Sequence, residues 1–340
     1  MWQPLSGIRV IDLSANAPGP FTSTMLADLG AHVTRITNPG GPPSYAGGEA
    51  DPLLSARSGP HNALARGKEA CALDLKSEAD RATLLEMVAG ADVVISEMRP
   101  GKLEALGLGW EALSATNPRL VLCEITGYGR EGPQAGWAGH DINYVAMAGV
   151  LSLCRDADGR PRAPQNILGD YAGGASLAAN GILAALLERS TTGTGRHMTV
   201  SMTDGVKYLA TDIAAATLLA GHEEESWRGT LGGEMPTYGC YETADGQWIA
   251  LGALEPKFIA ALAGVLGWPE LGPLVASRAT WPEARAGLAA RFTARDRAHW
   301  EAAFEGVDAC ATPVRSLAEA GAEGWPSLAQ VLGPRAATEA

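Results

Sequence analysis

The chain has 340 residues, of which 46% are hydrophobic, and a formal net charge of −12 at pH 7. This length and apolar content predict a large buried core divided between two domains. The acidic balance argues against bulk binding of nucleic acid or of an anionic membrane. The five cysteines form no CxxC pair and no Cys/His cluster, which predicts reduced core thiols rather than a zinc site or a disulfide framework.

The two ends of the chain carry no recognisable targeting signal. The N-terminal MWQPLSGIRV lacks the basic and long apolar regions of a signal peptide, and the final ATEA is not a peroxisomal address. The most apolar long segment, Tyr171–Leu187, is at about 17 residues at the short limit for a membrane span. Asp170 and Glu188 flank it, so we expect a buried helix. These features predict a cytoplasmic protein that binds no membrane.

Up to Ile125 the sequence alternates short β-branched runs with helical segments. This order predicts an α/β fold with parallel strands. No GxGxxG fingerprint is present, so a nicotinamide site is not supported. The predicted strands are Gly7–Leu13, Ala31–Ile36, Asp92–Ser96 and Leu120–Ile125, and the predicted helices are Thr22–Leu29 and Glu78–Val88.

A different pattern begins near Tyr128. From Thr237, alternating β-formers around Asp245-Gly246 predict a hairpin, and the helices after it predict a small α+β domain at about 230–315. The stretch TTGTG (Thr191–Gly195) is predicted as a loop. The predicted helices are one within Leu168–Arg189 that starts at Asp170, then Ser201–Leu219, Lys257–Leu266, Trp281–Phe292 and Arg297–Glu305.

Three ionisable residues stand at predicted loop-to-helix junctions. They are His140 in AGHDINY, Asp170 in ILGD, and Glu255 in ALEPKF. Each has an ordinary structural explanation, since Asp170 can cap a helix, Glu255 can favour a helix start before Pro256, and His140 can be a satisfied polar residue. Together, a His and two carboxylates could bracket one substrate carbon. The helix start at Asp170 would add N–H groups for an oxyanion.

Several motifs, in order from about Pro4 to Val314, resemble the family III CoA-transferases. They are GIRVIDLSANAPGPF, EMRPGKLEALGLG, TGYGREGPQAGWAGHDINY, NILGDYAGG and LGALEPKF. The resemblance implies a large α/β domain with a Rossmann-like CoA-binding half and a smaller α+β domain. It also implies an interlocked homodimer with the active site between the large domain of one subunit and the small domain of its partner. The expected boundaries are 1–189 for the large domain, 190–229 for linker helices, 230–315 for the small domain and 316–340 for a short return to the large domain.

The resemblance also bears on the reaction. Both branches of the family keep the Asp that matches Asp170: the transferases use it as a nucleophile that forms an acyl anhydride, and the racemases use it for proton transfer. The racemases add the His of the GHDINY motif, which is His140 here. The resemblance therefore implies an acyl-CoA racemase that epimerises the α-carbon of 2-methyl-branched thioesters through an enolate. The alternatives are CoA transfer between carboxylic acids and acyl-CoA binding without turnover.

The resemblance further implies that the partner subunit's Glu255 hydrogen-bonds His140. It implies no metal and no separate cofactor, because CoA is part of the substrate. The residues expected to line the CoA groove are Arg35, Arg66, Lys68 and Arg99, with Tyr128 and Gly129 of the TGYG motif, whereas Lys76 is expected to be a surface charge.

Three departures from the family pattern are visible. Asn38 stands where many relatives carry a basic residue, and Gly239 stands where racemases often have Asp. The return after Thr312–Val314 is short. We expect these departures to affect the CoA contact and the preferred acyl group.

Overall fold

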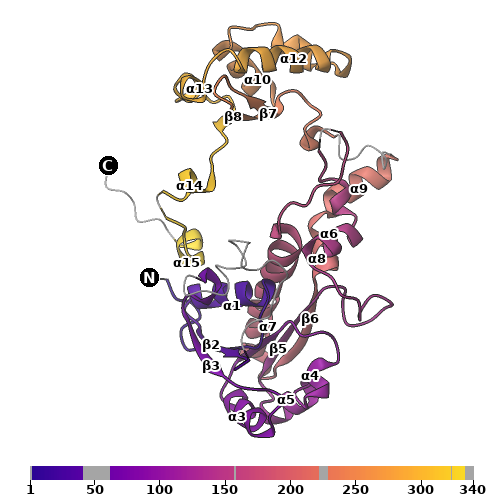
Figure 1. The fold of residues 1–340 in the computed structure, drawn as a ribbon, viewed down its shortest axis with the longest axis vertical. Coiled ribbons are helices and arrows are strands. Elements are labelled where there is room, and N and C mark those ends of the chain that lie inside the picture. Colours follow the sequence, from indigo (N-terminus) through magenta and orange to yellow (C-terminus); the bar gives the residue numbers. More distant parts are fainter. Residues whose placement is uncertain (1, 41–61, 157, 222–228, 323, 334–340) are drawn as a thin grey trace. The chain divides into compact units, whose positions relative to one another are not determined.

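The computed structural model describes residues 2–40, 62–156, 158–221, 229–322 and 324–333 (Figure 1). The chain forms two compact units, one of Met1–Ala215 with Pro326–Ala340 and one of Ala216–Trp325. The predicted linker and C-terminal return include residues 222–228 and 334–340, which lie outside the described residues.

The first unit is built on a six-stranded sheet in which every neighbouring pair is parallel. Its order is β3-β2-β1-β4-β5-β6, so the direction of progression reverses between β1 and β4. In open parallel sheets, ligands bind outside the carboxyl ends of the strands at such a reversal. The strands are β1 (Arg9–Asp12), β2 (His32–Thr37), β3 (Lys68–Ala72), β4 (Val93–Ser96), β5 (Val121–Thr126) and β6 (Arg196–Ser201).

Helices cover both faces of this sheet (Figure 1). Alternate strand residues point to opposite faces. Val10 and Val93 belong to the cluster that contains Leu26 and Ile182, whereas Ile11 and Val94 belong to another cluster. The helical elements are α1 (Pro18–Asp28), η1 (Ala63–Ala65), α3 (Glu78–Ala89), α4 (Lys102–Ala105), α5 (Trp110–Thr116), α6 (Asp141–Met147), η2 (Val150–Ser152), η3 (Ile167–Ser176), α7 (Leu177–Thr192), α8 (Met202–Leu209), α9 (Thr211–Ala220) and α15 (Leu328–Leu332).

The predicted parallel α/β architecture is confirmed, with corrections to several elements. α1 begins four residues before the predicted start at Thr22, because prolines are tolerated in the first turn of a helix. The helix predicted to start at Asp170 begins earlier, as the π-helix η3, and continues as α7. α7 includes Thr191 and Thr192, which the sequence predicts as loop. The helix predicted over Ser201–Leu219 is two helices with a break at Ala210.

The second unit contains a three-stranded antiparallel sheet in the order β7-β8-β9. The predicted hairpin is confirmed, and Gly246 adopts the positive φ that the turn requires. Phe292 is fully buried beside Trp300 and Phe304. The elements are η5 (Thr230–Gly232), β7 (Tyr238–Glu242), β8 (Trp248–Gly252), α10 (Pro256–Val265), α11 (Leu271–Val275), η6 (Arg278–Thr280), α12 (Trp281–Phe292), α13 (Arg297–Phe304), β9 (Ala311–Pro313) and α14 (Leu317–Ala320).

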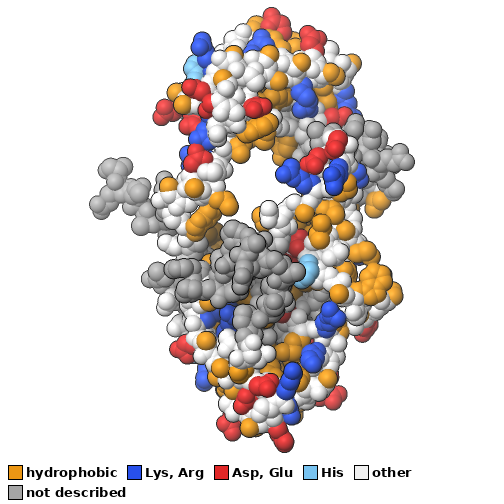
Figure 2. Space-filling view, in the orientation of Figure 1, with side chains coloured by type: hydrophobic (Ala, Val, Ile, Leu, Met, Phe, Trp, Pro, Cys, Tyr) orange, Lys and Arg blue, Asp and Glu red, His pale blue; other side chains and the backbone are white. Residues whose placement is uncertain are grey.

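The described surface carries exposed hydrophobic side chains among its charges. Figure 2 shows such side chains over α6 and α8, where Ile142, Met147, Tyr208 and Leu209 are exposed. No helix within the described ranges is long and apolar enough to cross a bilayer.

Candidate active site

Asp170 lies in the first turn of η3, after the N-cap residue Asn166. Three residues of η3, in the segment ILGDYAGGAS, are glycines and carry no side chain. π-Helical turns are rare and are frequent at functional sites. The Asn166 side-chain amide donates to Oδ2 of Asp170 at 3.0 Å, so the residue that precedes η3 also orients its carboxylate.

Asp141 holds the backbone that carries Asp170. Its Oδ1 accepts hydrogen bonds from the backbone N–H groups of Gly169 and Asp170, each at 2.7 Å. A Cβ at position 169 would lie 2.7 Å from this oxygen, which explains the glycine. Burial raises the pKa of Asp141, and the two backbone donors oppose that shift.

This arrangement corrects the expected oxyanion site. The sequence predicts that the amides at the start of the Asp170 helix hold an enolate oxygen. Two of them, at positions 169 and 170, already donate to Asp141. The Asp141 carboxylate therefore occupies the position that an oxyanion would take at these two donors.

The backbones of η3 and α8 are in close contact. A Cβ on Gly205 would lie 2.0 Å from the carbonyl oxygen of Gly173, and a Cβ on Gly173 would lie 2.8 Å from Val206 Cγ2. Only glycine permits backbones to approach this closely. The two glycines therefore let η3 rest directly on the start of α8.

His140 is the N-cap residue of α6, and its side chain is exposed. Its backbone N–H donates to Oδ1 of Asn143 at 3.1 Å. The preceding Gly139 lies against two aromatic rings, because a Cβ there would be 2.6 Å from the Tyr128 hydroxyl and 2.8 Å from the ring of Tyr144. The Tyr144 hydroxyl donates to the Gly139 carbonyl. The α6 start is thus fixed on both sides of the imidazole-bearing residue.

His140 and Asp170 line the same cavity, of about 460 Å³, within the first unit. Arg99, Tyr128 and Glu97 line it as well. The Tyr128 ring makes edge contacts with the rings of Tyr144 and Trp137, at centroid distances of 5.1 and 6.1 Å. The cavity thus joins an imidazole, two carboxylates and a guanidinium beside an aromatic wall.

Glu97 is a cavity residue that the sequence reasoning missed. Its carboxylate accepts backbone N–H groups from Ala15 at 2.7 Å, from Gly19 at 3.2 Å and from Asn16. Burial raises the pKa of Glu97, and these three donors oppose the shift. Its position just past the buried strand β4 was the available signal, since polar residues at the carboxyl ends of parallel strands gather at ligand sites.

Of the basic candidates, Arg99 reaches the cavity and two others are paired elsewhere. Arg66 forms an ion pair with Asp28 at 2.8 Å. The Lys68 ammonium donates to Ser23 Oγ at 2.6 Å and to the Pro20 carbonyl at 2.7 Å.

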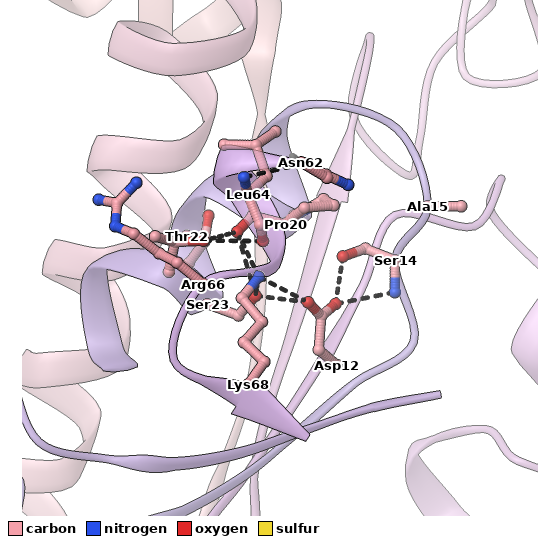
Figure 3. Close-up of polar contacts among 12 residues, drawn as sticks. Asp12, Ser14, Ala15, Pro20, Thr22, Ser23, Asn62, Leu64, Arg66 and Lys68 are labelled. Atoms are coloured by element: carbon pink, nitrogen blue, oxygen red, sulfur yellow. Dashed lines mark hydrogen bonds and ion pairs between the residues drawn. The ribbon is translucent and has the colours of Figure 1, made fainter. Parts of the chain in front are cut away.

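The Lys68 ammonium also lies 3.5 Å from Asp12 Oδ2, and its side chain is 1% exposed (Figure 3). Burial lowers the pKa of Lys68 to about 8, although Asp12 raises it. This buried network links β3 to β1 and α1, and it holds Lys68 away from the cavity.

The remaining candidates lie at several places. Arg35 is in β2, and within the described part of the chain its buried Nε has no hydrogen-bond partner. Gly129 follows β5 with φ of 91°, and its N–H donates to Thr126 Oγ1 at 3.1 Å. Glu255 is the exposed N-cap residue of α10 in the second unit.

The two single-residue departures from the family pattern are also located. The Asn38 side chain accepts the Gly40 N–H at 2.9 Å. Gly239 lies in β7 opposite Leu251. Among the described residues, no group of three or more His, Cys, Asp or Glu side chains is placed to hold a metal ion.

A parallel α/β unit with a carboxylate and an imidazole at one cavity defines an enzyme-like site. The model of CoA-transferase family III matches residues 5–329. The chain therefore belongs to CoA-transferase family III, as the sequence motifs predicted.

Named relatives include both branches of this family. Alpha-methylacyl-CoA racemase of Mus musculus is 38% identical over 317 residues, which cover 93% of this chain and 79% of the relative. Succinyl-CoA:glutarate CoA-transferase of Mus musculus is 32% identical over 337 residues, 97% of this chain and 75% of that protein. The crystal structure of a CAIB/BAIF family protein from Brucella suis has a TM-score of 0.78 at 28% identity and covers 98% of this chain and 89% of its own. The expected resemblance to alpha-methylacyl-CoA racemase is confirmed.

Proposed function

We propose that the protein racemises 2-methyl-branched acyl-CoA thioesters at the α-carbon. The observation that carries this proposal is that His140 and Asp170 line one cavity. A racemase that works through a planar enolate needs one acid/base group on each face of the reacting carbon. The 38% identity to alpha-methylacyl-CoA racemase of Mus musculus supports the same reaction.

In the proposed reaction, one of the two groups removes the α-proton as a base. The electron pair of the C–H bond moves onto the thioester oxygen to form an enolate. The other group, protonated, then delivers its proton to the opposite face of the α-carbon. The side chains of Asn166 and Asp141 support this step by fixing the carboxylate and the backbone of Asp170.

The CoA portion is proposed to enter past Arg99, the basic candidate that lines the cavity. Guanidinium groups bind phosphates strongly and with defined geometry. Arg35 is a second candidate, because its buried Nε has no hydrogen-bond partner within the described ranges. Arg66 and Lys68 are paired with Asp28 and Asp12, so they contribute through the fold around α1.

A second functional candidate is CoA transfer between carboxylic acids. The Asp170 carboxylate would attack the thioester carbonyl, expel the CoA thiolate and form an acyl anhydride. The relation to succinyl-CoA:glutarate CoA-transferase of Mus musculus favours this reading. The His140 imidazole has no assigned role in this CoA-transfer reaction.

The two reactions differ in an experiment with one enantiomer of a 2-methylacyl-CoA in D₂O. Racemisation incorporates deuterium at the α-carbon, and both configurations of that carbon appear with no acceptor acid present. The transferase is indicated instead if CoA moves only when a second carboxylic acid is added, or if hydroxylamine traps an acyl group on Asp170.

A further inference from the structure

The second unit contains an apolar groove of about 790 Å³ between α10 and α11. One wall is a face of α10 that includes Pro256, Ile259 and Gly264, and the opposite wall includes Val275 of α11. Among the residues that the structure describes, no side chain that lines the groove is ionisable. Cavities of this size with apolar and aromatic linings are typical of sites for small apolar ligands.

The groove has a rigid floor. The Trp268 indole lines it and is 8% exposed. On its other side, the ring lies against α12, where a Cβ on Gly287 would approach it to 2.2 Å, and the Arg291 guanidinium lies 3.8 Å from the ring centroid. The ring is therefore packed against α12 and makes a cation–π contact with it. Gly264 and Gly272 lie on the two walls of the groove and carry no side chain to fill it. No atom lies within 4 Å of the position that a Cβ at residue 264 or 272 would take.

The groove begins at the candidate site residue of this unit. Leu254 and Pro256 line it, and they are the two neighbours of Glu255 in the chain, about 4 Å away at the Cα atoms. From Pro256 to Gly264 the α10 wall extends about 12 Å at 1.5 Å per residue. A ligand whose polar end lies at Glu255 would therefore extend its apolar end along α10.

We propose that this groove binds the alkyl tail of the acyl group, so that the small unit selects thioesters by chain length. This inference rests on the proposed function, together with the expectation from the family resemblance that the partner subunit's Glu255 works with His140 at the reacting α-carbon. An alkyl tail is the part of the substrate that begins at that carbon and carries no charge. An uncharged alkyl tail therefore fits the apolar lining of the groove. The charged CoA phosphates and the polar thioester do not fit it.

The test fills the groove without disturbing the fold. Gly264→Leu adds a side chain where the structure has open space, and leucine favours a helix more than glycine does. Ala290→Leu is the matched control, because Ala290 is exposed on α12 and lies outside the groove. The full-length protein is assayed with a series of 2-methylacyl-CoA thioesters from short to long, for α-proton exchange and for equilibrium binding.

For the wild-type protein and for Ala290→Leu, we expect affinity to rise about fourfold for each added methylene until the groove is full. For Gly264→Leu, we expect unchanged binding of the shortest thioester and at least a tenfold loss for the longest. An unchanged chain-length dependence of binding in Gly264→Leu would overturn the inference. So would an equal loss for every thioester together with an altered oligomeric mass, because the groove would then seat a second copy.

The two readouts separate the inference from the function on which it rests. Binding alone decides whether the groove holds the tail. Failure of exchange with every thioester, the shortest included, contradicts racemisation even when binding depends on chain length.

Discussion

His140 and Asp141 are neighbours in the chain, yet one side chain lines the cavity and the other is buried beneath η3. The divergence follows from their places at the start of α6, where His140 is the extended N-cap residue and Asp141 is the first helical residue. The motif therefore supplies two tasks. His140 is available to a substrate, and Asp141 positions the backbone of Asp170.

The first prediction concerns the imidazole. We expect His140→Ala to reduce α-proton exchange by at least about 100-fold, because a positioned acid/base group typically contributes 10²–10⁴. Affinity for free CoA, measured by calorimetry, should stay near the wild-type value, because the CoA portion is proposed to contact Arg99. Exchange within a few-fold of wild type would contradict the assigned role.

The second prediction concerns Asp141. Asp141→Ala leaves the Gly169 and Asp170 amides without their acceptor, and each unsatisfied buried donor costs about 1–3 kcal/mol. We expect a lower free energy of unfolding in denaturant titrations and a lower kcat with little change in KM. Asp141→Asn keeps an oxygen at the same position, so it should recover most of the stability. Equal stability of the two variants would show that these hydrogen bonds contribute little.

At the level of elements, the central strands could be predicted and the edge strands could not. β4 and β5 are buried along their whole length, which gives the continuous apolar runs that identify buried parallel strands. β3 and β6 lie at the two edges of the sheet and are only partly buried, so KEACA and RHMTVS show no comparable run. η3 was not predicted as a π-helix, because side-chain periodicity does not report a local change of helical register.

The candidate site shows the same division between local and tertiary information. His140, Asp170 and Arg99 stand out locally, since each is next to a Gly or a Pro in a loop or at a helix start, and the structure places all three at one cavity. The hydrogen bonds from Gly169 and Asp170 to Asp141 join residues 28 and 29 positions apart, and Glu97 accepts from residues about 80 positions earlier in the chain. Such pairings depend on how α6, η3 and the loop before α1 pack.

The third prediction tests the contact between η3 and α8. Gly205→Ala places a methyl group 2.0 Å from the Gly173 carbonyl oxygen, so the two segments must move apart. Overpacking of this kind typically costs about 1–3 kcal/mol. We expect a lower melting temperature and reduced exchange activity, because η3 carries Asp170.

Gly264→Ala is the control for this substitution. It is the same change within a helix, at a position with open space, and it should stabilise by up to about 1 kcal/mol through helix propensity. If both variants lose stability equally, the close contact is not what makes Gly205 necessary.

At the scale of the whole molecule, the buried Lys68 links stability to pH. Its pKa is about 8 in the folded protein, against an ordinary value of 10.5. Between these values the unfolded chain keeps a proton that the folded protein has lost, so this residue's contribution to the free energy of unfolding rises with pH. The difference between these two pKa values corresponds to roughly 3 kcal/mol.

The fourth prediction isolates this contribution by comparing the wild-type protein with Lys68→Met. Other groups titrate in the same range, and the Cys123 thiol, whose pKa burial raises to about 12, acts in the opposite direction. We therefore expect the difference in unfolding free energy, wild type minus variant, to increase from pH 8 to pH 10.5 in urea titrations. A constant difference would show that Lys68 titrates alike in the folded and unfolded chains.

The fifth prediction tests the proposal that the catalytic assembly spans two subunits. His140 and Glu255 belong to different compact units. We propose that His140 of one chain works with the partner subunit's Glu255. His140→Ala and Glu255→Ala are each expected to be inactive as pure proteins. In a mixed dimer, the chain that retains His140 meets a partner that retains Glu255, so one of the two sites is complete.

Random mixing makes half of the dimers mixed, and so co-expression should restore about a quarter of the wild-type exchange rate. If Glu255 acts within its own chain, every site in every dimer lacks one of the two groups and no activity returns. A mixture of either variant with itself, prepared identically, sets the baseline. Recovery of activity would thus require the interlocked homodimer, or another dimer that exchanges these two units across subunits.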